Sequence, residues 1–171
     1  MTPAIDPNSA WTVAAAVIVG AGATLLMDLW AALLWRRWRV ASLDYALLGR
    51  WIGHFPAGRF RHANIARAAP VAHERAIGRT AHYAIGIAFA VLLVGVAGPE
   101  WLKHPTLLPA LLVSSATLAA PMLVMQPAFG LGVAASRTPR PNLARLRSTA
   151  THTVYGIGLY ATAWLLALAT R

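Results

Sequence analysis

The chain has 171 residues, of which 58% are hydrophobic and only 12% are charged. Because a soluble domain of this size carries about a quarter charged residues, this composition excludes an ordinary soluble domain and indicates a chain surrounded by lipid. The net charge of +10 comes from arginines between apolar runs, which fits membrane orientation better than nucleic-acid binding, and the lack of cysteine excludes disulfides and thiolate chemistry.

Four apolar runs are each long enough to cross a hydrocarbon core, which needs about 20 helical residues. The predicted membrane spans cover about residues 11–35, 77–98, 106–131 and 150–170. The first run lacks a basic leading segment, so we expect it to be a span and not a cleaved signal peptide. Pro121 and Pro127 predict a bend near Gln126 in the third span. The sequence therefore predicts an all-α fold, an integral membrane four-helix bundle that forms one transmembrane domain over residues 1–171.

The distribution of positive charge predicts the orientation. All lysines and arginines except Lys103 and Arg171 lie in or beside the two long connections, residues 36–76 and 132–149. The positive-inside rule places such connections in the cytosol. Both termini are then expected on the outside.

The first connection carries a helical pattern of its own. Apolar residues recur after Ser42 with the spacing of an amphipathic helix, and Ser42 is predicted to be its N-cap. We expect this interfacial helix, between the first and second spans, to lie on the cytosolic membrane surface. Pro70 closes a second, shorter predicted helix that contains Ile65.

The two halves of the chain show a weak internal similarity. Shifting the fourth span onto the second puts His152 on His82, and shifting the third span onto the first puts Gln126 on Asp28. The order and direction of the spans agree, which favours two duplicated helical hairpins related by an axis along the membrane normal. Identities this sparse also arise by chance in apolar sequence, so chance stays open as the alternative.

Asp28 is the sharpest candidate for a functional residue. It lies about 12 Å inside the cytosolic boundary of the first span at helical rise. A charge at that depth costs at least roughly 2.5 kcal/mol, so the side chain should face the bundle interior. It is either part of an ion or proton path or a buried group that fixes helix packing. We expect it to contact at least one of four groups, namely Arg50, His82, His152 or Gln126.

His82 and His152 lie about one turn inside the cytosolic ends of their spans, each four residues before a glycine. This arrangement admits a bis-histidine haem, with Gly86 and Gly156 making room for the ring. It also admits interfacial hydrogen bonding by the imidazoles and close helix packing at the glycines. The first reading predicts a haem-binding electron-transfer protein, and the second predicts no cofactor.

The cytosolic connections hold candidate ligands for anions. The guanidinium groups near His54 suit phosphate oxygens, so they could bind an anionic headgroup or a phosphorylated solute, or they could serve only as orientation charges against anionic lipid. The residues of this predicted site are His54, Arg50, Arg59, Arg61 and Arg137. No metal site is predicted, since the histidines and Glu74 lack a ligand spacing, and no nucleophile has a base nearby, so nothing indicates an enzyme.

Several segments together resemble a known family. They are GATLLMDLWAALL, SLDYALLGRWIGH, AHYAIGIAFA, PTLLPALLV, MQPAFGLGVAASRTPRP and THTVYGIGLY, which cover nearly the whole chain. They are similar to bacterial membrane proteins of the domain-of-unknown-function family 2938 (DUF2938). The resemblance implies a bacterial inner-membrane location and four spans, but it implies no reaction, substrate or catalytic residue.

These observations predict a protein that binds or translocates a small solute, ion or proton through a cytosol-facing polar pocket. The pocket is expected to be lined by Asp28, His82, Gln126 and His152. Haem-based electron transfer and a structural or assembly role without a small ligand are the alternatives. Because four helices form a narrow bundle, we expect a homo-oligomer, with small residues of the second and fourth spans as contact faces.

Overall fold

The structure is a computed structural model that describes residues 7–40 and 42–170. Four helical segments in this part of the chain are long and apolar enough to cross a membrane. The first, second and fourth are α1 (Pro7–Trp38), α3 (Glu74–Ala97) and α6 (Pro141–Ala169). The third consists of three consecutive pieces, α4 (Leu107–Thr117), η4 (Ala120–Met125) and α5 (Gln126–Ala128). Shorter helices join them, namely α2 (Tyr45–Gly53), η1 (Phe55–Ala57), η2 (Ile65–Arg67), η3 (Pro99–Leu102) and η5 (Val133–Ala135). The described residues form no strand, so the all-α class is confirmed.

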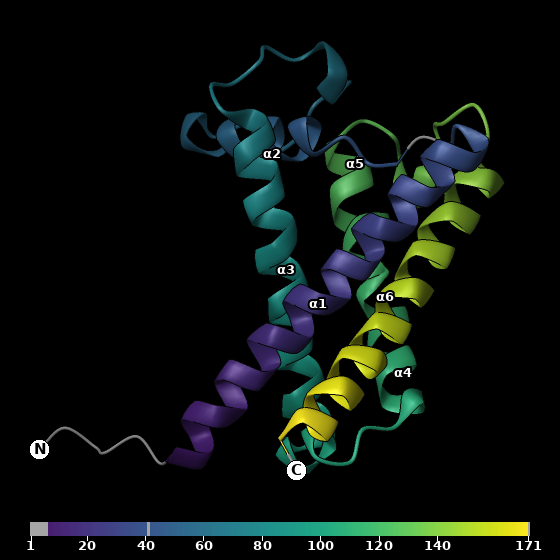
Figure 1. Cartoon of the computed structure of the whole chain (residues 1–171). Helices are drawn as coiled ribbons and strands as arrows, with labels where there is room; N and C mark the ends of the chain where they lie inside the picture. Colours follow the sequence, from purple (N-terminus) through teal and green to yellow (C-terminus); the bar gives the residue numbers. More distant parts are fainter. Residues whose placement is uncertain (1–6, 41, 171) are drawn as a thin grey trace, which may run out of the picture.

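The four candidate spans alternate in direction and pack as a bundle (Figure 1). The first turn of α1 and the last turn of α6 lie at one end of the bundle, whereas α2 and the two long connections lie at the other. We call the second end the basic end, because the arginines of both connections gather there. α1 packs along α6 and crosses α3, and α4 packs on α6.

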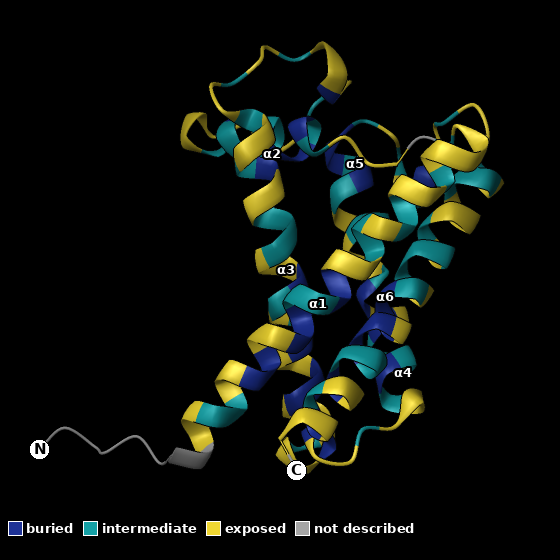
Figure 2. Ribbon diagram, in the orientation of Figure 1, coloured by how far each residue is buried: buried dark blue, intermediate teal, exposed yellow. Residues whose placement is uncertain are grey.

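The outer surface of the bundle is apolar, as lipid contact requires. Large hydrophobic side chains such as Val13, Leu29, Val96, Leu108 and Leu165 are exposed, and exposed residues run along every span in Figure 2. Only 22% to 33% of the most apolar window of each span is buried inside the bundle. An exposed apolar surface of this extent is what a bilayer covers, because a soluble monomer rarely leaves one in water.

Helix lengths differ from the predicted spans where helices continue beyond the apolar run. α6 begins at Pro141, nine residues before the predicted boundary at residue 150, and Arg145 and Arg147 lie on its first turns. Proline is favoured in the first turn of a helix, because its missing N–H would have no partner there. The helix therefore extends beyond the apolar run that hydropathy marks.

The third span is irregular close to the predicted bend. Its middle, Ala120–Met125, is π-helical, and the α-helical turn Gln126–Ala128 follows. Pro121 and Pro127 cannot donate backbone hydrogen bonds to the preceding turns, which removes two links of the α-helical ladder. The wider π turn accommodates these two prolines without ending the helix.

Small residues let the spans approach closely inside the bundle. Gly86 lies against the Thr24 hydroxyl, and Gly156 lies against the Ser114 hydroxyl. A Cβ atom added at Gly158 would lie 2.9 Å from the Cα of Ala23. Gly86, Gly156 and Gly158 are buried in the chain's own core. The bundle itself uses these three glycines, so a contact face between subunits would have to use other residues of these spans.

The contacts of these glycines also bear on the predicted duplication. The shift that puts Gln126 on Asp28 also puts Met122 on Thr24, and the shift that puts His152 on His82 puts Gly156 on Gly86. Since Gly86 faces Thr24, Gly156 should face Met122 if the two hairpins were equivalent. Gly156 instead faces Ser114, about two helical turns earlier. The helix order of the two hairpins agrees with a duplication, but the crossing point of the helices differs between them.

The helix α2 docks on α3 through two glycines. An added Cβ at Gly49 would overlap the backbone oxygen of Glu74, and one at Gly78 would overlap the backbone oxygen of Tyr45. The predicted N-cap was wrong: Asp44, not Ser42, caps α2, and its carboxylate accepts a hydrogen bond from the Ala46 N–H at 2.9 Å. The predicted short helix around Ile65 is confirmed as η2.

Candidate functional site

Three elements bring polar side chains together around Asp28. Asp28 lies on α1, Tyr45 begins α2, and His82 and Tyr83 lie on α3. Tyr45 Oη donates a short hydrogen bond to Asp28 Oδ1, and Tyr83 Oη donates to Asp28 Oδ2 at 3.1 Å. His82 Nε2 lies 3.3 Å from Asp28 Oδ1. The expectation that Asp28 faces inward and contacts one of four named groups is confirmed, with His82 as the partner.

The side chains of this interior cluster, Asp28, Tyr45, His82 and Tyr83, are largely shielded. His82 is 13% exposed and Asp28 22% exposed. The rings of Tyr45 and His82 stack with centroids 4.7 Å apart, and Tyr83 meets His82 edge-on at 5.8 Å. His82 Nε2 is buried and not aligned for a hydrogen bond, although it lies at ion-pair distance from the carboxylate. The imidazole is therefore held near the carboxylate without being fully bonded to it.

Tyr45 stays a donor over the whole physiological pH range. Burial and the hydrogen bond to Asp28 raise the pKa of Tyr45 far above its ordinary value. Its O–H therefore remains in place to hold the carboxylate. Because Tyr45 is the first residue of α2, this bond joins the connection at the basic end to the membrane interior.

The bundle becomes apolar below the interior cluster. Thr24, one turn from Asp28, bonds to its own helix at Gly20 O at 2.7 Å. The core beyond it is formed by Val19, Ala23, Leu93 and other buried hydrophobic residues. A cluster of buried apolar residues thus lies between Asp28 and the opposite end of the bundle.

A second polar group lies between the third and fourth spans. Gln126 Nε2 reaches Ser148 Oγ at 3.5 Å, and His152 Nδ1 donates to Ser148 O at 2.9 Å. The Oε1 atom of Gln126 is buried without a partner among the described residues. The four predicted pathway residues therefore form two groups, Asp28 with His82, and Gln126 with His152 through Ser148.

The haem alternative does not fit these positions. It required free space at Gly86 and Gly156, but Thr24 and Ser114 fill those positions. His82 stacks on Tyr45 and faces the carboxylate, so its ring is already held in place. Within the described residues, no group of three or more histidine or acidic side chains could hold a metal ion.

Arg50 is engaged inside the protein. Its Nε and Nη2 donate to the two carboxylate oxygens of Glu74, each at 2.8 Å, and its Nη1 donates to the backbone oxygens of Ile65, Ala66 and Ala68 at 3.2 to 3.3 Å. Glu74 accepts a further bond from the Val71 N–H. An anion at Arg50 would have to compete with Glu74, so this residue clamps η2 onto α2 and α3.

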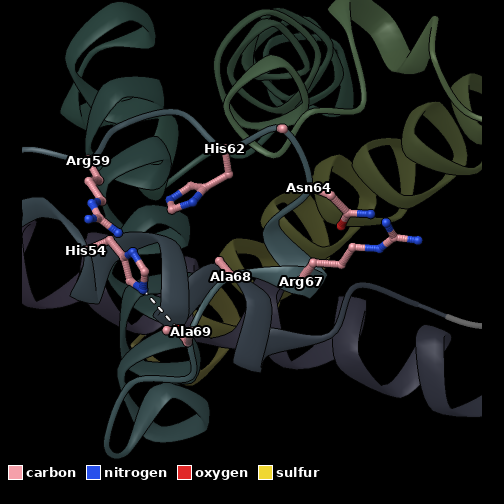
Figure 3. A pocket seen from close by; sticks show the side chains of 8 residues that line it. His54, Arg59, His62, Asn64, Arg67, Ala68 and Ala69 are labelled. Carbon is pink, nitrogen blue, oxygen red and sulfur yellow. Dashed lines mark hydrogen bonds between the residues drawn. The ribbon is translucent and has the colours of Figure 1, made fainter.

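The other predicted anion ligands line two open cavities at the basic end. The first, about 630 Å³, is lined by His54, Arg59, His62, Ala63, Asn64, Arg67, Ala68 and Ala69 (Figure 3). The second, about 550 Å³, is lined by Arg61, His62, Ala63, Pro127, Gly130, Gly132, Val133, Ser136 and Arg137. The structure thus separates the predicted ligands, with His54 and Arg59 at one cavity and Arg61 and Arg137 at the other.

The family model described as protein of unknown function (DUF2938) matches residues 17–166. The chain belongs to this family. The match includes the interior cluster and both cavities, so these features lie within the DUF2938 region and not in an appended segment. No curated protein and no solved structure matches the chain. Because the family carries no assigned reaction, the geometry of the DUF2938 chain is the basis for a functional proposal.

Sequence reasoning missed several residues of these sites. Tyr45 was taken as part of an apolar helix face, and Tyr83 was not singled out although it follows His82. His62, Asn64 and Arg67 join the first cavity because the connection folds back beside the end of α2. The one signal for Tyr45 was its place next to Asp44, where a cap fixes the start of a helix.

Proposed function

We propose that this multi-pass membrane protein binds a proton at the Asp28–His82 pair and translocates it through the bundle. The observation that carries the proposal is a carboxylate inside a candidate span in contact with an imidazole, the side-chain type whose ordinary pKa lies nearest to neutral pH. Intramembrane carboxylates are expensive, and proton relays are one of the uses for which proteins keep them.

The close contacts of the pair favour a proton over a larger solute. Tyr45 and Tyr83 bond directly to the Asp28 oxygens, and His82 lies 3.3 Å away, so these groups contact one another with no solute between them. A larger solute would need space between these groups. A proton does not, because it passes along hydrogen bonds. His152 and Gln126 extend the polar groups toward the fourth span, where the unpartnered Gln126 Oε1 offers an acceptor.

Protonation of Asp28 also has a structural consequence. The carboxylate accepts from Tyr45 and Tyr83 at once, and a neutral carboxyl group is a weaker acceptor. Loss of the charge therefore weakens the bond that joins α2 to α1. We expect this change to loosen α2 from α1 as a proton is taken up, which would couple proton binding to a movement at the basic end.

Proton flux into proteoliposomes with a trapped pH-sensitive dye tests the proposal. The wild-type protein is expected to acidify the lumen faster than protein-free liposomes, and Asp28→Asn is expected to abolish the difference, because it keeps the side-chain shape but binds no proton. Glu100→Gln is the matched control, since Glu100 is an exposed carboxylate that pairs with Lys103. Wild-type flux equal to that of empty liposomes, or unchanged flux in Asp28→Asn, would contradict the proposal and favour an assembly role without a small ligand.

We further propose that the basic end faces the cytosol of a bacterial inner membrane and that both chain ends lie outside it. The arginines of both connections support this orientation, because positive loops are retained on the cytosolic side. A cysteine placed at Ser9 is expected to react with a membrane-impermeant thiol reagent in intact cells. A cysteine at Ser136 is expected to react only after lysis. The reverse pattern would overturn the orientation.

The homo-oligomer remains a proposal with a different surface. Its contact face would have to come from the exposed side chains of the spans, because the glycines of α3 and α6 are used inside the bundle. Gly95 is the exception, since an added Cβ there meets nothing within 4 Å.

A further inference from the structure

The loop between α2 and α3 is built as a rigid frame. Its residue His62 donates its backbone N–H to Ala128 O at 2.8 Å, and Ile65 donates to Phe129 O at 3.1 Å, so the loop is bonded to the end of the third span. Asn64 caps η2, and Arg50 binds three carbonyl oxygens of the same segment. The backbone positions from which the side chains of this segment project are therefore held relative to one another.

The frame presents positive charge on both sides of His62. Arg59 and Arg67 line the first cavity, and Arg61 and Arg137 line the second, while His62 and Ala63 border both. Figure 3 shows His54, Arg59 and His62 grouped at one side of the first cavity, with Asn64 and Arg67 at the other. Guanidinium groups on opposite sides of a cavity suit an anion with several oxygens.

The described carboxylates do not neutralise these arginines. Asp28 belongs to the interior cluster, Asp44 caps α2, Glu74 pairs with Arg50, and Glu100 pairs with Lys103. None of the three ion pairs in the described chain includes an arginine that lines either cavity. The residues that line the cavities include no acidic side chain.

We propose that the first cavity binds a phosphate-bearing ligand, with Arg59 and Arg67 as its main charged contacts and Asn64 and His62 beside them. The cavity volume of about 630 Å³ lies in the range of small-molecule sites and exceeds what inorganic phosphate alone would fill. The ligand is therefore a phosphorylated compound with an organic part. The same chemistry is found in a soluble phosphomonoester and in the headgroup of an anionic lipid.

Binding should be linked to protonation of His62. Burial and the charges of His54 and Arg59 lower the pKa of His62, so it is neutral near pH 7 in the free protein. The positive charges of Arg67 across the first cavity, and of Arg61 and Arg137 across the second, also favour the neutral form of His62. A bound phosphate offsets these charges and raises the pKa of His62, so binding takes up a proton and becomes tighter as the pH falls through that pKa.

Binding to the full-length protein in detergent tests the site, with pyrophosphate as the soluble probe and potassium chloride of equal ionic strength as the salt control. Pyrophosphate is expected to raise the melting temperature. Arg59→Gln and Arg67→Gln should each weaken its affinity about tenfold, since a hydrogen bond to a charged group contributes roughly 1.5 kcal/mol or more. Arg147→Gln is the matched control, because Arg147 is exposed and lines neither cavity.

Nanodiscs separate the two sources of the ligand. A lipid headgroup would be identified by three results together. The protein retains phosphatidic acid in preference to phosphatidylcholine, the Arg59→Gln and Arg67→Gln variants lose this preference, and pyrophosphate has no effect. An effect of pyrophosphate without retention of phosphatidic acid would identify a soluble ligand. The affinity for pyrophosphate depends on pH partly because pyrophosphate itself titrates. His62→Gln should leave only that part of the pH dependence of the affinity. Binding of neither probe, or binding unchanged in Arg59→Gln and Arg67→Gln, would overturn the proposal.

Discussion

Gly78→Ala is expected to displace α2 from α3 and to destabilise the protein by about 3 kcal/mol, the upper part of the range for overpacked cores. The added methyl group would overlap the backbone oxygen of Tyr45, and its carbon would also lie only 2.9 Å from the Gly49 backbone nitrogen. Backbone atoms cannot rotate aside as a side chain can, so α2 must move. The midpoint of thermal unfolding in detergent, followed by tryptophan fluorescence, measures the loss.

Gly95→Ala in the same helix is the control for this substitution. An added Cβ at Gly95 meets nothing within 4 Å, and alanine is a better helix former than glycine by roughly 1 kcal/mol, so stability should stay equal or rise. Because α2 carries Tyr45, Gly78→Ala should also reduce proton flux as Asp28→Asn does. If Gly78→Ala unfolds at the same temperature as Gly95→Ala, the close docking of α2 is wrong.

Arg50→Met is expected to release the connection between α2 and α3. The substitution keeps an unbranched apolar stem but removes the guanidinium group, and with it the two bonds to Glu74 and the three bonds to the backbone oxygens of Ile65, Ala66 and Ala68. It also leaves the Glu74 carboxylate without its cation, which is more damaging than losing both partners. Limited digestion with trypsin should show cleavage at Arg59, Arg61 and Arg67 roughly tenfold faster than in the wild type, because opening of a segment governs proteolysis.

A second substitution separates the ion pair from a general loss of fold. In the Arg50→Met, Glu74→Gln double variant, the uncompensated charge is gone, and glutamine retains an oxygen for the Val71 N–H. Resistance to trypsin should then recover in part. Arg75→Met, which changes an exposed arginine on the same turn of α3, should digest at the wild-type rate. Equal digestion of Arg50→Met and Arg75→Met would show that Arg50 is not a clamp.

The sequence predicted the membrane spans well because apolar runs of this length have few other uses. The first and last helices extend beyond the predicted spans, to Trp38 and Pro141, because their helical turns continue past the apolar runs. The docking of α2 could not be predicted, because nothing in the local pattern shows that Gly49 and Gly78 face each other. The N-cap was misplaced by two residues, since serine and aspartate are similarly good caps.

The interior cluster was predicted only in part, for a physical reason. The cost of a carboxylate in a span made Asp28 stand out, and the level of His82 in the next span made it a candidate partner. The phenols of Tyr45 and Tyr83 carry no comparable cost, so their positions in the sequence gave no sign that they would bond to Asp28. Arg50 illustrates the converse, because a guanidinium group suits a phosphate and a glutamate equally well. Only the folded chain shows that Glu74 is the partner.

The distance along the chain between Asp28 and its partners affects how the protein is made. During synthesis the first span enters the bilayer before His82 and Tyr83 have been translated, and at roughly 5 to 20 residues per second the delay is on the order of several seconds. Throughout that interval α1 must hold its carboxyl group in the membrane unaided. The apolar length of α1, with a mean hydropathy of 2.0 in its best window, compensates for that burden. Shortening this run should therefore impair insertion of the nascent chain, even where the finished bundle would be stable.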